Sequence, residues 1–198
     1  MPNLKLAGSA IGQKAGLLEE FEKWKAPGPK ALWLLLAGAT APPETIRISR
    51  RRNSGSFLLG VSHDLANMEG AAVVMSNLHN VVRNFNLTKE DAKGEIQKLF
   101  RECMVRKEQP VVYYTGHGEI GTGNWCFADG TLSLHEIEEL LEGCSHPLLI
   151  SDSCYSGHWA NLCINRTLPK THCLAACPKY SAAHDTGEQK SGLRIPLN

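Results

Sequence analysis

The segment 110–118 reads PVVYYTGHG, and the segment 147–157 reads PLLISDSCYSG. Each begins with residues that favour β-strands and passes directly into glycine and polar residues. A third segment, ALWLLLAG at 31–38, is apolar throughout, which is typical of a strand buried on both faces of a parallel sheet. The three segments predict the central strands of one sheet, and functional groups are expected just past their carboxyl ends.

Helical patterns separate these predicted strands. Thr88 with Asp91 three residues on, and Ser133 with Glu136, have the spacing of helix N-caps and predict two helices. A further helix is predicted from apolar residues at helical spacing after Asp64, which are Leu65, Met68, Ala72, Met75 and Leu78. Shorter strands are predicted at 57–61, 124–128 and 171–176. The alternation predicts an α/β fold with a mostly parallel sheet and helices on both faces.

The composition is that of an ordinary globular chain. The 198 residues suffice for one domain, and 21 Lys and Arg against 20 Asp and Glu give a net charge of +1. This balance provides no overall field that would attract nucleic acid or an anionic membrane, so neither is expected as a partner. Seven cysteines without a CxxC spacing favour a reducing compartment, and no segment resembles a signal peptide or a membrane span. The expected location is therefore cytoplasmic.

His117 and Cys154 follow two of the predicted strands. If these strands are neighbours in a parallel sheet, both residues lie at the same edge. A nucleophilic cysteine needs a cation or dipole that favours the thiolate and an acid that protonates the leaving amine, and an imidazole supplies both. The glycines beside His117 leave room for a peptide backbone, and the N–H of Gly118 can face a developing oxyanion. The two segments therefore form a candidate site for nucleophilic catalysis.

These segments resemble the catalytic motifs of the caspase-like cysteine peptidases, in particular the metacaspase and paracaspase branch. Residues 114–118 read Tyr-Thr-Gly-His-Gly where that family has Tyr-Ser-Gly-His-Gly, and residues 152–157 read Asp-Ser-Cys-Tyr-Ser-Gly where it has Asp-Ser-Cys-His-Ser-Gly. The resemblance spans about residues 30–187 and implies a three-layer sandwich. It leaves an N-terminal helix and linker at 1–29 and an irregular tail at 188–198.

The resemblance also implies the roles of the site residues. Cys154 would be the nucleophile, His117 the general acid and base, and the backbone N–H groups of Gly118 and Cys154 the oxyanion hole. The implied reaction is hydrolysis of a peptide bond in a protein or peptide substrate through an acyl-enzyme. It needs no metal or cofactor, and activation by calcium, which some family members require, stays open.

Asp152 carries the expectation about the substrate. In the metacaspase-like branch, the residue two positions before the nucleophile lines the primary specificity pocket. A buried carboxylate there pairs with a guanidinium or ammonium group and repels a substrate Asp. Cleavage after Arg or Lys is therefore expected. The basic segment Arg47 to Arg52 is then either a self-cleavage site or a solvated loop.

Several alternatives stay open. The family fold normally continues through a further helix and strand, so an apparently shortened C-terminus makes a caspase-type dimer unexpected and leaves a second hypothesis, a catalytically weak or inactive regulatory module. A nucleotide-binding domain is disfavoured because no glycine-rich phosphate loop follows the first strand. His158 is an alternative catalytic histidine, and four residues have side chains that could bind zinc, namely Cys163, His172, Cys173 and Cys177.

Overall fold

The structure is a computed structural model that describes residues 30–38, 60–75, 77–144, 146–165 and 171–180. Its elements, in chain order, are β1 (Ala31–Ala37), α3 (Val61–Met75), β2 (Asn77–Val82), α4 (Lys89–Arg106), β3 (Gln109–Thr115), β4 (Trp125–Cys126), β5 (Thr131–Leu132), α5 (Leu134–Glu139), β6 (Leu148–Asp152), α6 (Gly157–Ile164) and β7 (His172–Ala175). The expected N-terminal helix, the basic segment 47–52 and the tail at 188–198 lie outside the described residues.

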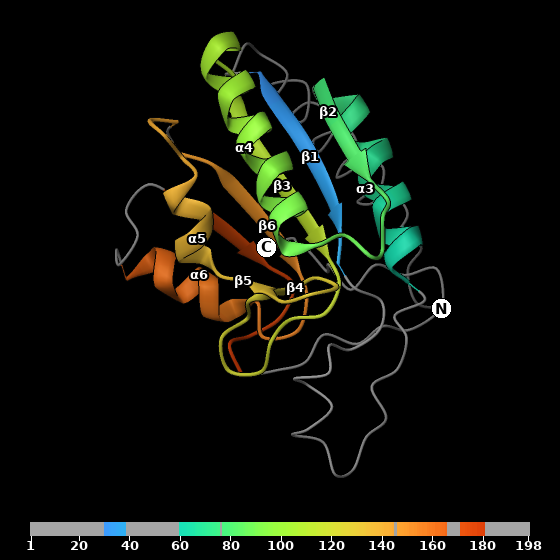
Figure 1. The fold of residues 1–198 in the computed structure, drawn as a ribbon, viewed down its shortest axis with the longest axis vertical. Coiled ribbons are helices and arrows are strands. Elements are labelled where there is room, and N and C mark those ends of the chain that lie inside the picture. Colours follow the sequence, from blue (N-terminus) through green and yellow to red (C-terminus); the bar gives the residue numbers. More distant parts are fainter. Residues whose placement is uncertain (1–29, 39–59, 76, 145, 166–170, 181–198) are drawn as a thin grey trace, which may run out of the picture. The chain divides into compact units, whose positions relative to one another are not determined.

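Five strands form one sheet in the order β2–β1–β3–β6–β7, and each pairs with its neighbours in parallel (Figure 1). β3 and β6 are adjacent, with Tyr113 opposite Ile150 and Thr115 opposite Asp152. The two strands that precede the candidate motifs are therefore neighbours, and their carboxyl ends lie at the same edge. β4 and β5 form a separate antiparallel pair.

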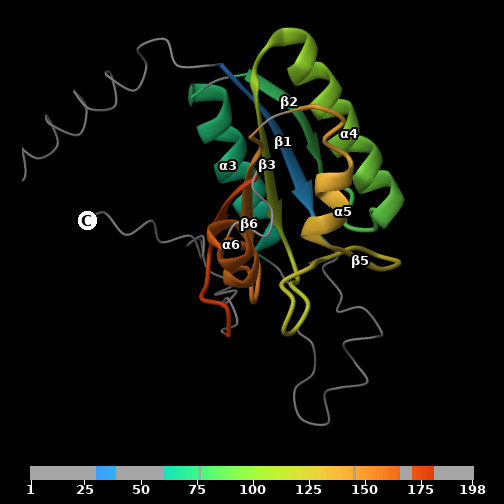
Figure 2. The same ribbon diagram turned by 90° about the vertical axis from the view of Figure 1, so that its left-hand side faces the viewer.

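Helices cover both faces of the sheet. Figure 2 shows α3 on one side and α4 with α5 on the other. Alternate strand residues enter two buried cores, because successive side chains of a strand point to opposite faces. The α3-side core comprises Trp33, Leu35, Ala37, Val61, Leu65, Ala72, Val111, Tyr113 and Ile150. The α4-side core includes Leu32, Leu34, Leu36, Ile96, Phe100, Val112, Tyr114, Trp125, Leu149 and Trp159. The predicted α/β architecture, with a parallel sheet between helices, is confirmed.

The expected N-caps are present. The Thr88 hydroxyl accepts a hydrogen bond from the Asp91 N–H at 3.1 Å, and α4 follows directly. Ser133 and Glu136 form a reciprocal capping box in front of α5. Both caps satisfy N–H groups that the first helical turn leaves without a partner.

Two expectations about the region before α4 are wrong. The structure describes only residues 60 and 61 of the strand expected at 57–61. They do not form a strand, because Val61 is the first residue of α3. The helix expected to reach Leu78 ends at Met75, and Leu78 lies in β2. β2 reads NLHNVV and pairs only with β1 at the border of the sheet. A strand at the border of a sheet needs few apolar residues. The polar residues of β2 therefore gave no strand pattern in the sequence.

The described helices include none that is both long enough and apolar enough to cross a membrane.

Candidate active site

Tyr114 holds the backbone of the segment that follows β3. The Tyr114 hydroxyl donates a hydrogen bond to the His117 carbonyl oxygen at 2.7 Å. The Cys126 N–H lies 3.1 Å from the same carbonyl oxygen and 3.0 Å from the Tyr114 hydroxyl. The backbone of His117 is therefore fixed by β3 on one side and by β4 on the other, while the His117 residue itself is half-buried.

Two glycines make room for this tyrosine. A Cβ on Gly116 would lie 2.7 Å from the Tyr114 hydroxyl oxygen, and a Cβ on Gly38 would collide with the same group. Gly38 directly follows β1 and donates its N–H to the Thr115 carbonyl oxygen at 2.8 Å. The buried tyrosine hydroxyl thus reaches the His117 backbone only because both neighbours lack side chains.

The segment after β6 turns sharply at the residue that follows Cys154. Tyr155 has a φ of 59°, in the left-handed region that a residue with a Cβ adopts at a cost of about 1–2 kcal/mol. Gly123, whose φ is +71°, packs against this turn, since a Cβ on it would lie 2.5 Å from the Tyr155 carbonyl oxygen. The half-buried Cys154 is therefore presented on a bent connection between β6 and α6.

Cys177 holds the same turn from the end of β7. Its N–H donates to the Ser156 hydroxyl at 3.3 Å, and its Sγ lies 3.2 Å from the Ser153 carbonyl oxygen. Cys177 is buried, and its thiol bonds to Ser153, the residue before Cys154. The sequence suggested Cys177 only as a zinc ligand, and this contact was not predicted.

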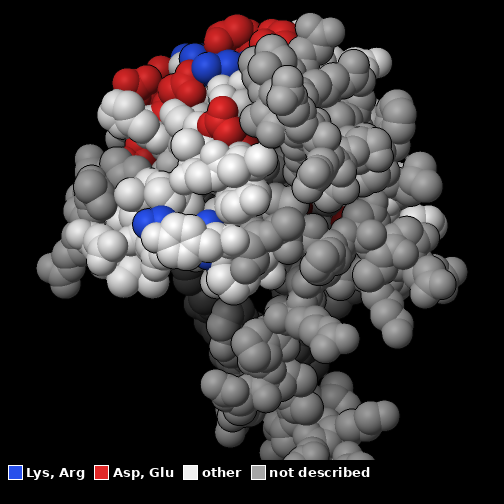
Figure 3. Space-filling view, turned by 90° about the horizontal axis from the view of Figure 1, so that it is seen from below, with Lys and Arg blue, Asp and Glu red and all other residues white. Residues whose placement is uncertain are grey.

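The segments that carry His117 and Cys154 touch at their backbones. The Gly116 N–H donates to the Asp152 carbonyl oxygen at 3.3 Å. A Cβ on Gly118 would collide with the carbonyl oxygen of Cys154, so only glycine permits this approach. The structure therefore brings together the two sequence motifs at the carboxyl edge of β3 and β6. In Figure 3, which views the molecule from below, Asp and Glu side chains of the described residues gather beside Lys and Arg side chains near the upper border of the picture.

Asp152 lies on the face of β6 that is turned toward the α3-side core. It is 8% exposed, and the Tyr113 hydroxyl donates to its Oδ2 at 3.0 Å. Burial raises the pKa of the Asp152 carboxyl, and the hydrogen bond from Tyr113 opposes that rise. Burial, followed by the charge of Asp152, also raises the pKa of Tyr113, so this hydroxyl stays protonated and acts as a donor.

Asp64 adds a second carboxyl group to this region. It lies in the first turn of α3, and the Thr115 hydroxyl donates to its Oδ2 at 3.4 Å. The charge of Asp64 contributes to the raised pKa of Tyr113, which places it within electrostatic reach of the Asp152 site. From the sequence, Asp64 was predicted only as the start of a helix. The sequence carried one signal that could have pointed to Asp64: it is an acidic residue in the first turn of a helix, and such a turn can lie near a strand's carboxyl end.

The alternative site residues have other surroundings. His158 is the second residue of α6, and burial followed by the charge of Lys179 lowers its pKa. Of the four residues considered for zinc, Cys163, His172 and Cys173 line one hollow beside α6 and β7, whereas Cys177 lies apart from them and bonds to Ser153 and Ser156. Within the described ranges, no group of three or more His, Cys, Asp or Glu residues is placed to hold a metal ion.

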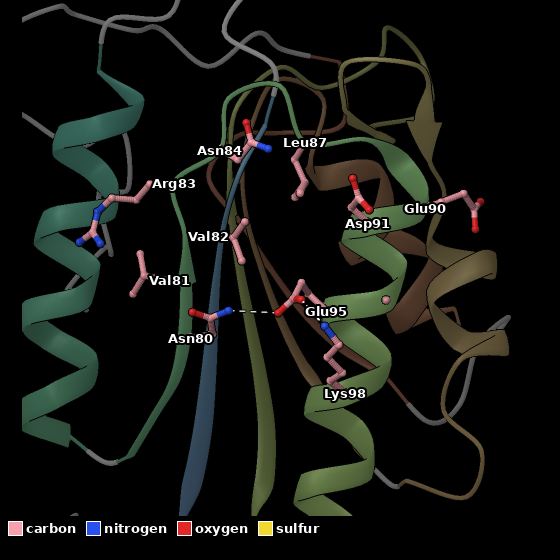
Figure 4. Close-up of a pocket in the computed structure, with 11 residues that line it drawn as sticks. Asn80, Val81, Val82, Arg83, Asn84, Leu87, Glu90, Asp91, Glu95 and Lys98 are labelled. Carbon is pink, nitrogen blue, oxygen red and sulfur yellow. Dashed lines mark hydrogen bonds and ion pairs between the residues drawn. The ribbon is translucent and has the colours of Figure 1, made fainter.

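A hollow of about 560 Å³ lies between β2 and the first half of α4 (Figure 4). Its carboxylates have partners within the chain. Glu95 accepts from Asn80 at 3.1 Å and from Lys98 at 2.7 Å, and Glu90 pairs with Lys93 at 3.3 Å. None of its lining residues belongs to the two motif segments, so it is not part of the candidate site.

No protein-family model matches the chain, and no curated protein matches its sequence. The functional assignment therefore rests on the residues and on their geometry.

Proposed function

We propose that the chain is a cysteine endopeptidase that hydrolyses peptide bonds after Arg or Lys. One observation supports this most strongly: the segments that contain His117 and Cys154 are in backbone contact at the carboxyl ends of neighbouring parallel strands. Functional groups gather at this edge in α/β sheets. The buried carboxyl group of Asp152, the last residue of β6, would supply a partner for a basic substrate side chain.

In the proposed reaction, the Cys154 thiolate attacks the carbonyl carbon of the scissile bond and forms a C–S bond. The N–H groups of Gly118 and Cys154 stabilise the resulting oxyanion. His117 donates a proton to the leaving amine as the C–N bond breaks, which leaves an acyl-enzyme. His117 then takes a proton from water, whose oxygen attacks the thioester; the C–S bond breaks, the acid is released, and the Cys154 thiolate and protonated His117 are restored.

The proposed specificity rests on Asp152 and Asp64. A substrate guanidinium placed beside Asp152 would offset the cost of burying that carboxylate, because an opposite charge favours its ionised form. Asp64 would add a second, more solvated negative charge. A substrate Asp would meet two like charges, so cleavage after Asp is disfavoured.

The finer fold assignment, a caspase-like three-layer sandwich, belongs to the same proposal. The parallel sheet with α3 on one face and α4 and α5 on the other is compatible with it. The order of the motifs along the chain, with the histidine segment after β3 and the cysteine segment after β6, is also that of the family.

A cleavage assay on the purified chain tests the function. Matched fluorogenic peptides ending in Arg, Lys or Asp are compared, with and without calcium, and Cys154→Ala is the control. The expected result is turnover after Arg or Lys that disappears in the variant. Turnover after Asp would contradict the specificity, and no turnover by the folded protein would favour a non-catalytic module.

A further inference from the structure

A chain of three buried polar side chains ends beside Cys154. The Trp125 indole N–H donates to the Ser151 hydroxyl at 2.9 Å, and the Ser151 and Ser153 hydroxyl oxygens lie 3.0 Å apart. All three residues are at most 1% exposed. Ser153 directly precedes Cys154, so a side chain on β4 is connected to the residue next to the nucleophile.

The chemistry of these groups fixes the direction of the first hydrogen bond. An indole nitrogen only donates, so the Ser151 oxygen is the acceptor of the first bond. Its own hydroxyl hydrogen is then available to Ser153. Buried hydrogen bonds of this kind are costly to leave unmade, which favours one arrangement of the three side chains.

The Trp125 ring is itself held in place. It stacks on Tyr114, with ring centroids 4.7 Å apart and an interplanar angle of 8°, and its centroid lies 4.8 Å from that of Trp159. A ring packed on two sides has a fixed orientation, so its N–H points in a fixed direction.

The same short strand also contacts the histidine segment. Trp125 forms an antiparallel bridge with Gly118, and the N–H of the next residue, Cys126, donates to the His117 carbonyl oxygen at 3.1 Å. Ser153 approaches the histidine segment too, since its Oγ lies 3.1 Å from the position of a Cβ on Gly118. β4 thus bonds directly to the His117 segment and is linked to the Cys154 segment through Ser151.

We propose that Trp125 is a positioning residue, which fixes the Cys154 segment relative to the His117 segment through its indole N–H, Ser151 and Ser153. This inference rests on the proposed function, because it assigns a purpose to the relative placement of the two segments. It concerns the hydrogen bond of Trp125 and not the bulk of its ring.

Trp125→Phe tests this distinction, because it keeps an aromatic ring in the stack and removes the N–H. The expected result is a fall in kcat of about 10- to 100-fold, the size associated with small misplacements of reacting groups, with KM unchanged. Trp33→Phe is the matched control: it makes the same chemical change in the separate α3-side core, where the ring does not pack against Trp125, and should leave kcat unchanged. Equal losses in both variants would overturn the proposal.

Ser151→Ala provides an independent route, because it breaks the chain in its middle and leaves both rings intact. Its kcat should fall as in Trp125→Phe. The double variant should lose little more than either single variant, since both changes remove the same hydrogen bond. Additive losses would show that Ser151 and Trp125 act separately and would contradict the inference.

Alkylation of Cys154 provides a readout that does not depend on peptidase turnover. The rate of iodoacetamide modification of the peptide containing Cys154 is followed by mass spectrometry as a function of pH. The midpoint of this profile should move to higher pH in Trp125→Phe and Ser151→Ala, because a displaced imidazole stabilises the thiolate less, and should not move in Trp33→Phe. Absence of turnover in the unmodified protein would refute the proposed function alone, whereas identical alkylation profiles in all variants would refute the positioning role.

Discussion

Ser151 and Asp152 are neighbours in β6, yet they belong to different environments. Ser151 faces the α4-side core, where it bonds to the Trp125 indole. Asp152 faces the α3-side core, where it accepts from Tyr113, with Asp64 and Thr115 nearby. The first environment contains uncharged groups in hydrogen-bonded contact, and the second contains carboxyl groups with restricted access to water.

This difference suggests that the two faces of the sheet contribute to the site in different ways. The uncharged side holds backbone segments in place and changes little with pH. The acidic side holds carboxyl groups whose ionisation costs free energy when they are buried and is favoured by a nearby cation. Because strand residues alternate between faces, one strand end can serve both purposes with consecutive residues. Each of the following variants changes only one of the two sides.

Asp152→Asn should have the largest effect. It leaves a substrate guanidinium without its buried partner, which costs about 2–5 kcal/mol, or roughly 30- to 4,000-fold in kcat/KM for peptides ending in Arg. Peptides with a small neutral residue at the same position should be cleaved as before. Equal losses on both peptide types would show that Asp152 supports the dyad rather than the specificity.

The stability of the same variant provides a control for folding. Burial holds the pKa of Asp152 above its ordinary value, so the folded state binds this proton more tightly than the unfolded chain. The stabilisation from this proton is present at low pH and is lost as the pH rises from the ordinary value through the raised pKa. At neutral pH, urea denaturation of Asp152→Asn should therefore show a free energy of unfolding at least equal to that of the original chain.

Tyr114→Phe affects only the uncharged side. It removes the hydroxyl that donates to the His117 carbonyl oxygen, and kcat should fall about 10- to 100-fold as the histidine segment shifts. The unfolding free energy should fall by about 1–3 kcal/mol, because buried partners lose a hydrogen bond. The ratio of cleavage after Arg to cleavage after Lys should stay constant, and a changed ratio would mean that the two sides are coupled.

Asp64→Asn should have a smaller effect on the acidic side. The Asp64 residue is half-buried, so its interaction with a substrate cation is partly screened and is expected to contribute about 1 kcal/mol, roughly fivefold in KM for Arg peptides. The maximal rate should not change. A loss as large as that of Asp152→Asn would place the substrate cation between the two carboxylates rather than beside Asp152.

Tyr113→Phe should produce the smallest change, visible only in the pH profile. The Tyr113 hydroxyl favours the ionised form of Asp152, so its removal raises the pKa of that carboxyl further. Since the ionised form binds the cation, KM for Arg peptides should begin to increase at a higher pH than in the original chain as the solution is acidified. The profile for a neutral peptide should not move, and a parallel shift in both would assign the effect to another group.

The sequence predicted the parts of this architecture that depend on local pattern. The apolar run at 31–37, the cap at Thr88 and the capping box at Ser133 have short-range causes, and all were found where expected. The two motif segments were expected to meet at one sheet edge if their strands are neighbours, and the structure pairs β3 with β6. β2 was missed because its polar residues carry no strand pattern.

The tertiary contacts of the site could not be predicted. Trp125 lies 26 residues from Ser151, and Cys177 lies 24 residues from Ser153, so nothing in the local sequence links them. Asp64 and Thr115 are 51 residues apart. Such pairs depend on the order and register of the strands, which a single sequence does not specify.

The most direct test of the central claim is covalent labelling of the purified chain with a peptidyl-arginine chloromethyl ketone, read by mass spectrometry. The account predicts one added label, on Cys154, which Asp152→Asn slows and His117→Ala nearly abolishes. Labelling of another cysteine, or equal labelling by a matched peptidyl-aspartate reagent, would contradict the assignment of Cys154 and His117 as a dyad with basic specificity.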